Sequence, residues 1–139
     1  MKKNMEYTEI TDYAKVCEVN KQSADFFPNV SNLPKEEADD VIKSLMLKRV
    51  IRALNTDPET GKVWEPDWSD HSQLKYSVWV EVEASKDQPW GFGFSLSYYV
   101  NWGTDAIAGS RLCLESRDKV MHLHKYFKQL LLDTYLILR

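Results

Sequence analysis

The sequence predicts an α+β fold in which N-terminal helices come first, a small antiparallel sheet of about three strands follows, and a long C-terminal helix packs on that sheet. Two observations predict it. Apolar residues recur at helical spacing in three segments, and they alternate with polar residues in two segments between the second and third of these. The 139 residues are enough for one core, so we expect residues 1–139 to form a single domain.

Residues 8–20 are the first predicted helix, and residues 21–33 are predicted as a loop because proline, asparagine and serine interrupt the periodicity there. We expect Phe26 and Phe27 to pin this loop to the body of the domain. Together, residues 1–33 are interpreted as a helix and loop that pack loosely. The inward face of the helix is predicted at Ile10, Tyr13, Val16 and Cys17.

Residues 34–55 are the second predicted helix. Pro34 suits a first helical turn, acidic residues crowd the N-terminal end, and Lys48, Arg49 and Arg52 lie toward the C-terminal end. We interpret these three cations as solvated residues that complement the helix dipole, and a phosphate contact is the alternative. The apolar stripe of this helix is predicted at Ile42, Leu45, Met46, Val50, Ala53 and Leu54.

Alternation of apolar and polar residues predicts antiparallel strands at residues 76–83 and 92–100, and a short third strand at residues 110–114. The outward face is expected to carry Ser77, Trp79, Glu81 and Glu83 from the first strand, Tyr99 from the second and Arg111 from the third. The inward face is expected at Tyr76, Val78, Val80, Val82, Phe92, Phe94, Leu96, Tyr98 and Val100.

Residues 116–138 are the last predicted helix, with Ser116 as its N-cap. Its inward face is predicted at Val120, Leu123, Phe127, Leu130 and Thr134, with Ile137 or Leu138 at its end. Residues 130–138 are apolar almost all round, so this end is either deeply packed or shared with a second copy of the chain. We therefore expect a homodimer formed through the C-terminal helix.

The charge of the chain argues against a general nucleic-acid binder, whose surface is usually basic. The net charge is −3, and residues 56–90 contain three Lys against eight Asp and Glu, a local net charge of −5. No apolar run is long enough to span a bilayer, and the first residues do not read as a secretory signal. The sequence therefore predicts a cytoplasmic protein that does not contact a membrane.

The side chains that could bind a metal or act as a nucleophile do not form the pattern of an active site. His122 and His124 are two apart on a helix and point in different directions, so they cannot hold one metal ion. Asp67, Asp70 and His71 share a turn, where a metal or hydrolase site is less favoured than a solvated turn. Cys113 is interpreted as structural, because a reactive thiol needs a helix N-terminus or a cationic partner. We predict no catalytic residue, no metal and no cofactor, and hence no enzyme.

Two tryptophans flank a proline in an acidic segment, and we interpret both as mainly structural. Pro66 fixes an extended turn between Trp64 and Trp68, and burial of one indole is worth a few kcal/mol, on the order of 2–3. Lys75 is expected over one of the rings, a contact worth about 0.5–1 kcal/mol if exposed. The candidate binding surface comprises Trp64, Asp67, Trp68, Lys75, Trp79, Tyr99 and Arg111.

Short motifs within residues 40–135 carry a resemblance to known sequences. They are Ala53-Leu54-Asn55, Trp64 with Pro66, Asp67 and Trp68, Lys75-Tyr76 with Trp79, Gly109 to Cys113 with Ser116, and Phe127 with Leu130 and Asp133. On these motifs the chain resembles a family of small uncharacterised proteins of phages and prophage-like elements, many from gut Bacteroidales. Leu114 departs from the aromatic residue usual there, and "DPETGK" lengthens the link before Trp64.

The resemblance implies a setting and no activity: a mobile element in a bacterial host, where such proteins often serve replication, host takeover or defence evasion. We therefore predict a non-enzymatic accessory protein that acts through protein–protein interaction, with an unidentified protein partner. The alternative is a module for single-stranded nucleic acid or nucleotides that uses the sheet face with Trp79, Tyr99 and Arg111, because aromatic rings beside arginine suit bases.

Overall fold

The structure, a computed structural model, describes residues 4–70, 72–83, 93–102 and 110–135. Of residues 79–83, 93–102, 110 and 135 it describes the backbone alone. The protein is a mixed helix-and-strand fold that is mostly helical, which confirms the predicted class in outline. Its elements in chain order are η1 (Tyr7–Glu9), α1 (Tyr13–Asn20), α2 (Lys35–Leu54), β1 (Lys75–Glu83), β2 (Gly93–Trp102), η2 (Ser110–Leu112) and α3 (Arg117–Tyr135).

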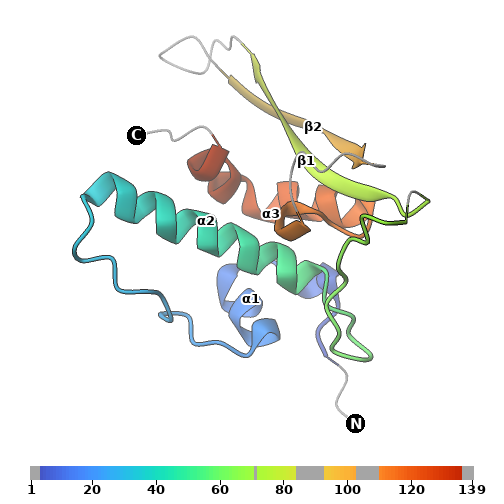
Figure 1. Cartoon of the computed structure of the whole chain (residues 1–139), viewed down its shortest axis with the longest axis horizontal. Coiled ribbons are helices and arrows are strands. Elements are labelled where there is room, and N and C mark those ends of the chain that lie inside the picture. Colours follow the sequence, from blue (N-terminus) through green and yellow to red (C-terminus); the bar gives the residue numbers. More distant parts are fainter. Residues whose placement is uncertain (1–3, 71, 84–92, 103–109, 136–139) are drawn as a thin grey trace.

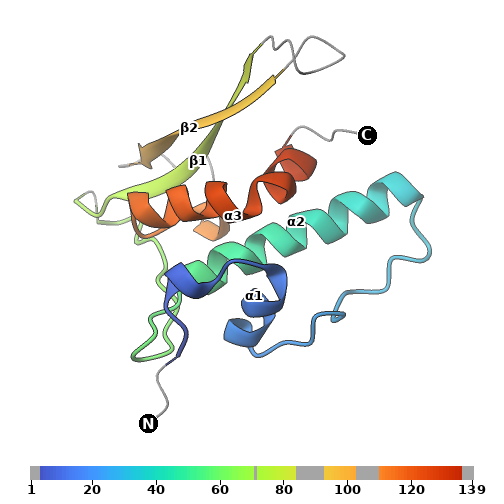
Figure 2. The same ribbon diagram turned by 180° about the vertical axis from the view of Figure 1, so that it is seen from behind.

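The elements lie in layers. The two strands are on one side of α3, and α2 packs on the other side of α3, with α1 beyond it (Figures 1 and 2). The core therefore lies between the helices and is completed by the start of β1. It is formed mainly by Ile10, Val16, Leu47, Val50, Ile51, Ala53, Leu54, Leu114, Val120, Leu123, Phe127, Leu130 and Leu131.

The predicted N-terminal helix is divided, because α1 begins only at Tyr13. Asp12 has extended backbone angles, and its carboxylate accepts a hydrogen bond from the Lys15 N–H at 3.0 Å, which caps the new helix. Ile10 lies before this cap and is fully buried, as is Val16 within the helix. These two side chains therefore contribute to the central core.

The loop between α1 and α2 is attached to the body through Phe27, in part as predicted. The Phe27 ring stacks on Tyr13 with centroids 6.3 Å apart. Phe26 instead remains 63% exposed and contacts the Arg49 guanidinium at 5.7 Å from its ring centroid. Phe27 thus makes the closer attachment.

Helix α3 begins after Ser116, whose hydroxyl accepts a hydrogen bond from the Lys119 N–H at 3.3 Å. This confirms the predicted N-cap. Non-helical backbone angles at Phe127 kink the helix, yet Phe127, Leu130 and Leu131 are all buried in the core of this chain. The described part of the apolar C-terminal end is thus deeply packed. Residues 136–138 lie outside the described part, and the homodimer stays a prediction that light scattering can test.

Within the described residues, the sheet has two strands and not the predicted three. β1 and β2 pair antiparallel, from Lys75 opposite Trp102 to Glu83 opposite Gly93. The expected third strand at residues 110–114 instead begins as the 3-10 helix η2, and only Leu114 joins the sheet, through one antiparallel bridge to Tyr76. The two N–H groups of this bridge lie 3.2 and 2.8 Å from their carbonyl acceptors. Five residues of alternating pattern were too few to distinguish a strand from a tight turn.

The start of β1 is buried on both faces. Tyr76 and Val78 pack against the core as predicted. Lys75 and Ser77 alternate with them on the other face. Ser77 was expected to be exposed there, but it is 3% exposed and Lys75 is fully buried. Within β1 the alternation was therefore right about which residues share a face and wrong about exposure. Across the sheet it was wrong near this end, because Tyr98 and Val100, predicted inward, lie opposite Trp79 and Ser77. None of the described helices combines the length and apolar character needed to cross a membrane.

Candidate ligand-binding cleft

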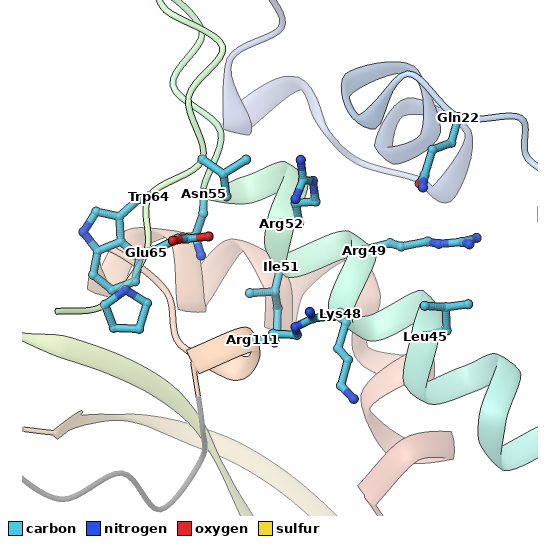
Figure 3. Close-up of a pocket in the computed structure, with 12 residues that line it drawn as sticks. Gln22, Leu45, Lys48, Arg49, Ile51, Arg52, Asn55, Trp64, Glu65 and Arg111 are labelled. Carbon is cyan, nitrogen blue, oxygen red and sulfur yellow. The ribbon is translucent and has the colours of Figure 1, made fainter. Parts of the chain in front are cut away.

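A cleft of about 420 Å³ lies between the C-terminal half of α2 and the segment 63–66, a volume typical of small-molecule sites. Its charged side chains are four cations and one carboxylate, in a protein whose net charge is −3. We call it the basic cleft (Figure 3). It is lined by Gln22, Leu45, Lys48, Arg49, Ile51, Arg52, Asn55, Val63, Trp64, Glu65, Pro66 and Arg111.

Asn55 holds the walls of the basic cleft together at the end of α2. Its backbone carbonyl accepts a hydrogen bond from the Trp64 N–H at 2.9 Å. Its side-chain amide donates to the Cys113 carbonyl at 2.8 Å and accepts from the Glu115 N–H at 3.1 Å. Because this buried residue bonds to two distant segments, it sets the position of Trp64 and of the chain that follows Arg111.

The segment that carries Trp64 is fixed at both ends. Beyond the bond from Trp64 to Asn55, the Asp67 N–H donates to Gln73 Oε1 at 2.6 Å. Pro66 restricts the backbone between these two points. Trp64 is therefore held at the edge of the cleft by a preorganised stretch of chain, and it is half-buried there.

Three cations in the cleft have exposed side chains: Lys48 and Arg52 from α2, and Arg111 from η2. Among the residues that the structure describes, none of the three forms an ion pair with a carboxylate. Figure 3 shows the Arg111 and Lys48 side chains on the same side of α2, and Arg52 on the other side in this view. Like charges that line one cleft without counter-charges favour an anionic ligand.

Arg49, the fourth cation of the cleft, forms its contacts within the protein. It is 8% exposed, its guanidinium donates to the Tyr13 hydroxyl at 3.1 Å, and it lies 4.8 Å from the Phe27 ring centroid. Burial raises the pKa of the Tyr13 hydroxyl, and the hydrogen bond from Arg49 partly opposes that effect. The predicted basic trio is therefore divided: Arg49 ties α1 and its loop to α2, while Lys48 and Arg52 line the cleft.

The second tryptophan belongs to a closed arrangement. Lys75 was predicted at a binding surface, but it is fully buried, so it cannot contact a ligand there. Its ammonium donates to the carbonyls of Asp70 at 3.1 Å and Gln73 at 2.9 Å, and lies 5.3 Å from the Trp68 ring centroid. The expected contact of Lys75 with a tryptophan is confirmed, in the interior of the protein. We call this group of Trp68, Asp70, Gln73 and Lys75 the lysine turn.

The acidic residues of that turn accept hydrogen bonds from neighbouring serines. The Ser69 hydroxyl and N–H lower the pKa of the Asp67 carboxyl, and those of Ser72 lower the pKa of Asp70. These bonds are of the kind that close Asx turns. His71 was considered with Asp67 and Asp70 as a metal or hydrolase site, and it lies outside the described residues. Within the described chain, no three side chains of metal-ligating type come together.

Trp79 and Tyr99, the remaining residues of the predicted surface, have side chains outside the described part. The backbone register pairs Trp79 with Tyr98 and Tyr99 with Val78. Since directly opposed residues lie on the same face of a sheet, the positions of Trp79 and Tyr99 are on opposite faces. The predicted grouping of these two with Arg111 on one face is therefore wrong.

The remaining side chains that could take part in catalysis or metal binding are packed within the fold. His122 Nε2 lies 2.7 Å from the Ile10 carbonyl oxygen, and its ring contacts Tyr7 and Tyr126. Burial lowers the pKa of His124. Burial also raises the pKa of the Cys113 thiol, the opposite of what a nucleophile needs.

Of the predicted surface, the structure brings together Trp64 and Arg111. Sequence reasoning missed Glu65 and the bonds of Asn55, which it named only within a motif, and it gave a phosphate contact for Lys48 and Arg52 only as the alternative. Asparagine after a helix reads as an ordinary stop signal, so its role as a clamp had no separate signature. A comparison of the chain with protein-family models, with curated proteins and with solved structures found no match.

Proposed function

We propose that this protein is a non-enzymatic binding module for a nucleotide, either free or within a single strand of nucleic acid, held in the basic cleft. The observation that carries the proposal is that Lys48, Arg52 and Arg111, without described ion pairs, line the same cleft as Trp64. Cations suit phosphate, and an indole offers a stacking face for a base, worth about 1–3 kcal/mol.

The cations of the cleft remove the main objection that the sequence raised. The acidic segment 56–90 contributes only Val63, Trp64, Glu65 and Pro66 to the cleft, whereas its cations come from α2 and η2. The local field at the cleft is therefore set by residues distant in sequence. Two residues of the predicted binding surface, Trp64 and Arg111, belong to the proposed site. The sheet face does not.

A protein partner is supported less well by the described residues. The large apolar side chains that are exposed, Phe26, Val41, Leu74, Met121 and Tyr126, come from four separate segments, and single exposed apolar residues are ordinary. The volume of the cleft also suits a small ligand better than a protein surface. From the sequence resemblance we place the binding event in the cytoplasm of a bacterium that carries a mobile element.

Isothermal titration calorimetry with ribonucleoside monophosphates and triphosphates, and with short single-stranded oligonucleotides, tests the proposal. We expect binding at 50 mM salt that weakens at 200 mM salt, because phosphate contacts release counterions. A steeper salt dependence for oligonucleotides than for mononucleotides would identify the strand as the ligand. Pyrophosphate tests the role of the ring: it should bind more weakly than a nucleotide, since it cannot stack.

The variants Arg52→Ala and Trp64→Ala should each lower the affinity about tenfold, equivalent to about 1.4 kcal/mol. Lys35→Ala is the matched control, because it removes an exposed cation from the same helix outside the cleft. No heat of binding with any of these ligands at 50 mM salt would contradict the proposal. Equal losses in Lys35→Ala and Arg52→Ala would show a general charge effect instead of a site.

A further inference from the structure

The exposed cations of the basic cleft lie in two separate places. Figure 3 shows Arg52 on one side of α2, and Lys48 with Arg111 on the other side in this view. Ile51 lies between Arg52 and Arg111 in the same view, and its apolar side chain also lines the cleft. Because Ile51 is 3% exposed, it forms part of the floor of the cleft. The basic cleft therefore has two positively charged regions with an apolar residue between them.

The order of residues along α2 gives the cleft a direction. Asn55 follows the last residue of α2, and its carbonyl accepts the hydrogen bond from the Trp64 N–H. Arg52 precedes Asn55 by three residues and Lys48 precedes it by seven. At 1.5 Å per residue, these separations are about 4.5 Å and about 10 Å along the helix axis. Arg52 is thus the cation of α2 nearer the attachment of Trp64, and Lys48 lies farther from it.

We infer that the basic cleft binds two phosphates with one sugar between them, which rests on the proposed binding of a nucleotide. The first phosphate contacts Arg52. The second contacts Lys48 and Arg111, and the sugar lies over Ile51. Guanidinium groups bind phosphate through paired hydrogen bonds, and an ammonium binds it as a point charge. A phosphate over Ile51 would lose hydration without gaining a partner, whereas an uncharged sugar avoids that cost.

This spacing of charge occurs in a single strand of nucleic acid and in a free nucleoside 3′,5′-bisphosphate. The di- and triphosphates of a nucleoside differ, because one oxygen atom joins their phosphates directly and no uncharged spacer separates them. They therefore fill one charged region and leave the other without a partner. The two regions thus select a ligand by the separation of its charges as well as by its total charge.

The test compares adenosine 3′,5′-bisphosphate with the 5′-mono-, di- and triphosphates of adenosine, by calorimetry on the full chain. We expect the 3′,5′-bisphosphate to bind about tenfold more tightly than any of the others, because it forms charge-assisted hydrogen bonds in both regions. The triphosphate is the control for charge, since it carries a similar charge without the sugar between its phosphates. Base and sugar are the same in all four ligands, so the difference reports the placement of phosphate.

The variants Lys48→Ala and Arg52→Ala separate the two regions. Lys48→Ala should weaken the 3′,5′-bisphosphate about tenfold and the monophosphate by less than about threefold, whereas Arg52→Ala should weaken both about tenfold. Both side chains are exposed, so the variants should fold, which circular dichroism checks. Lys35→Ala is again the matched control. Equal losses for the two ligands in Lys48→Ala would show that a single phosphate uses all the cations, and that result overturns the inference.

Two dinucleotides with a 5′-phosphate distinguish the sources of such a ligand. One contains the ordinary phosphodiester, and the other contains an uncharged methylphosphonate in its place. Binding of the phosphodiester that is about tenfold tighter assigns the two regions to a strand. Equal binding of the two dinucleotides, with the 3′,5′-bisphosphate still preferred over the triphosphate, assigns them to the free nucleotide.

The remaining outcomes also decide the question. A di- or triphosphate that binds as tightly as the 3′,5′-bisphosphate would overturn the separate phosphate contacts while the nucleotide site stands. No binding of any adenosine nucleotide or dinucleotide would overturn both the nucleotide site and the inference. Loss of binding in Trp64→Ala, together with loss of the preference for the 3′,5′-bisphosphate in Lys48→Ala, supports both.

Discussion

The lysine turn and the basic cleft are built from the same kinds of residue, and they differ in whether the cation is satisfied within the protein. In the lysine turn, the buried Lys75 ammonium contacts two carbonyls and the Trp68 ring. In the basic cleft, Lys48, Arg52 and Arg111 line the same cleft as Trp64, without described ion pairs. Residue type alone therefore does not separate a structural tryptophan from a binding one, whereas burial and partners do.

The sharpest difference should appear when the buried lysine is removed. Lys75→Ala leaves the carbonyls of Asp70 and Gln73 without their donor and leaves a cavity under Trp68. We expect a loss of about 3 kcal/mol in the free energy of unfolding, and a fall in Tm of roughly 10 °C by circular dichroism. Lys62→Ala, at an exposed site in the preceding turn, should change stability by less than about 0.5 kcal/mol.

Exchange of either tryptophan for alanine tests the comparison directly. Trp68→Ala should lower Tm by several degrees, roughly 2 kcal/mol, because the ring covers Lys75. It should leave nucleotide affinity unchanged. Trp64→Ala should show the reverse, with a smaller change in Tm and about a tenfold loss of affinity. Unchanged melting of Trp68→Ala together with lost binding would move Trp68 into the binding site.

The two arginines of α2 provide a second pair. Arg49→Ala removes the hydrogen bond to Tyr13 and the contact with the Phe27 ring, so we expect a loss of about 1–2 kcal/mol in urea denaturation. Arg49→Lys should restore little, because an ammonium lacks the planar fork. Arg52→Ala should lose less than about 0.5 kcal/mol in stability and instead weaken nucleotide binding. Similar destabilisation by both would remove the distinction between them.

The smallest expected effect is a loss of stability at low pH. The pKa values of Asp67 and Asp70 are lowered in the folded protein by hydrogen bonds from Ser69 and Ser72. Their contribution is therefore fully present above the unfolded pKa of about 4, and is lost as the pH falls through the folded values. Carboxyl carbon shifts followed by NMR should titrate below the usual range. Ser69→Ala with Ser72→Ala should return both pKa values toward it, and unchanged shifts in that double variant would contradict this cause.

Elements with long periodic patterns could be predicted from the sequence, and short ones could not. A helix was predicted at residues 34–55, and α2 begins at Lys35 and ends at Leu54. The agreement is close because a periodic pattern of about twenty residues specifies a helix well. The predicted strand 110–114 failed because its pattern was short. The division at Asp12 was missed because a capping carboxylate competes locally with a continuing helix.

The candidate site was predictable only in its parts. Trp64 and Arg111 were each named from composition and motif, but 47 positions separate them in the sequence. Their approach depends on bonds from Asn55 to the Trp64 N–H and to the segment at Cys113, which no local pattern reveals. Lys48 and Arg52 looked like a solvated helix end, since the sequence does not show what packs beside that end.

The clamp at Asn55 also determines how a ligand can be admitted. Both walls of the cleft are bonded to this one buried residue, so they cannot separate unless the end of α2 comes apart with them. The opening therefore has a nearly constant width, and association should proceed as a single step without a slower closing phase. Admission then becomes a question of molecular size and shape.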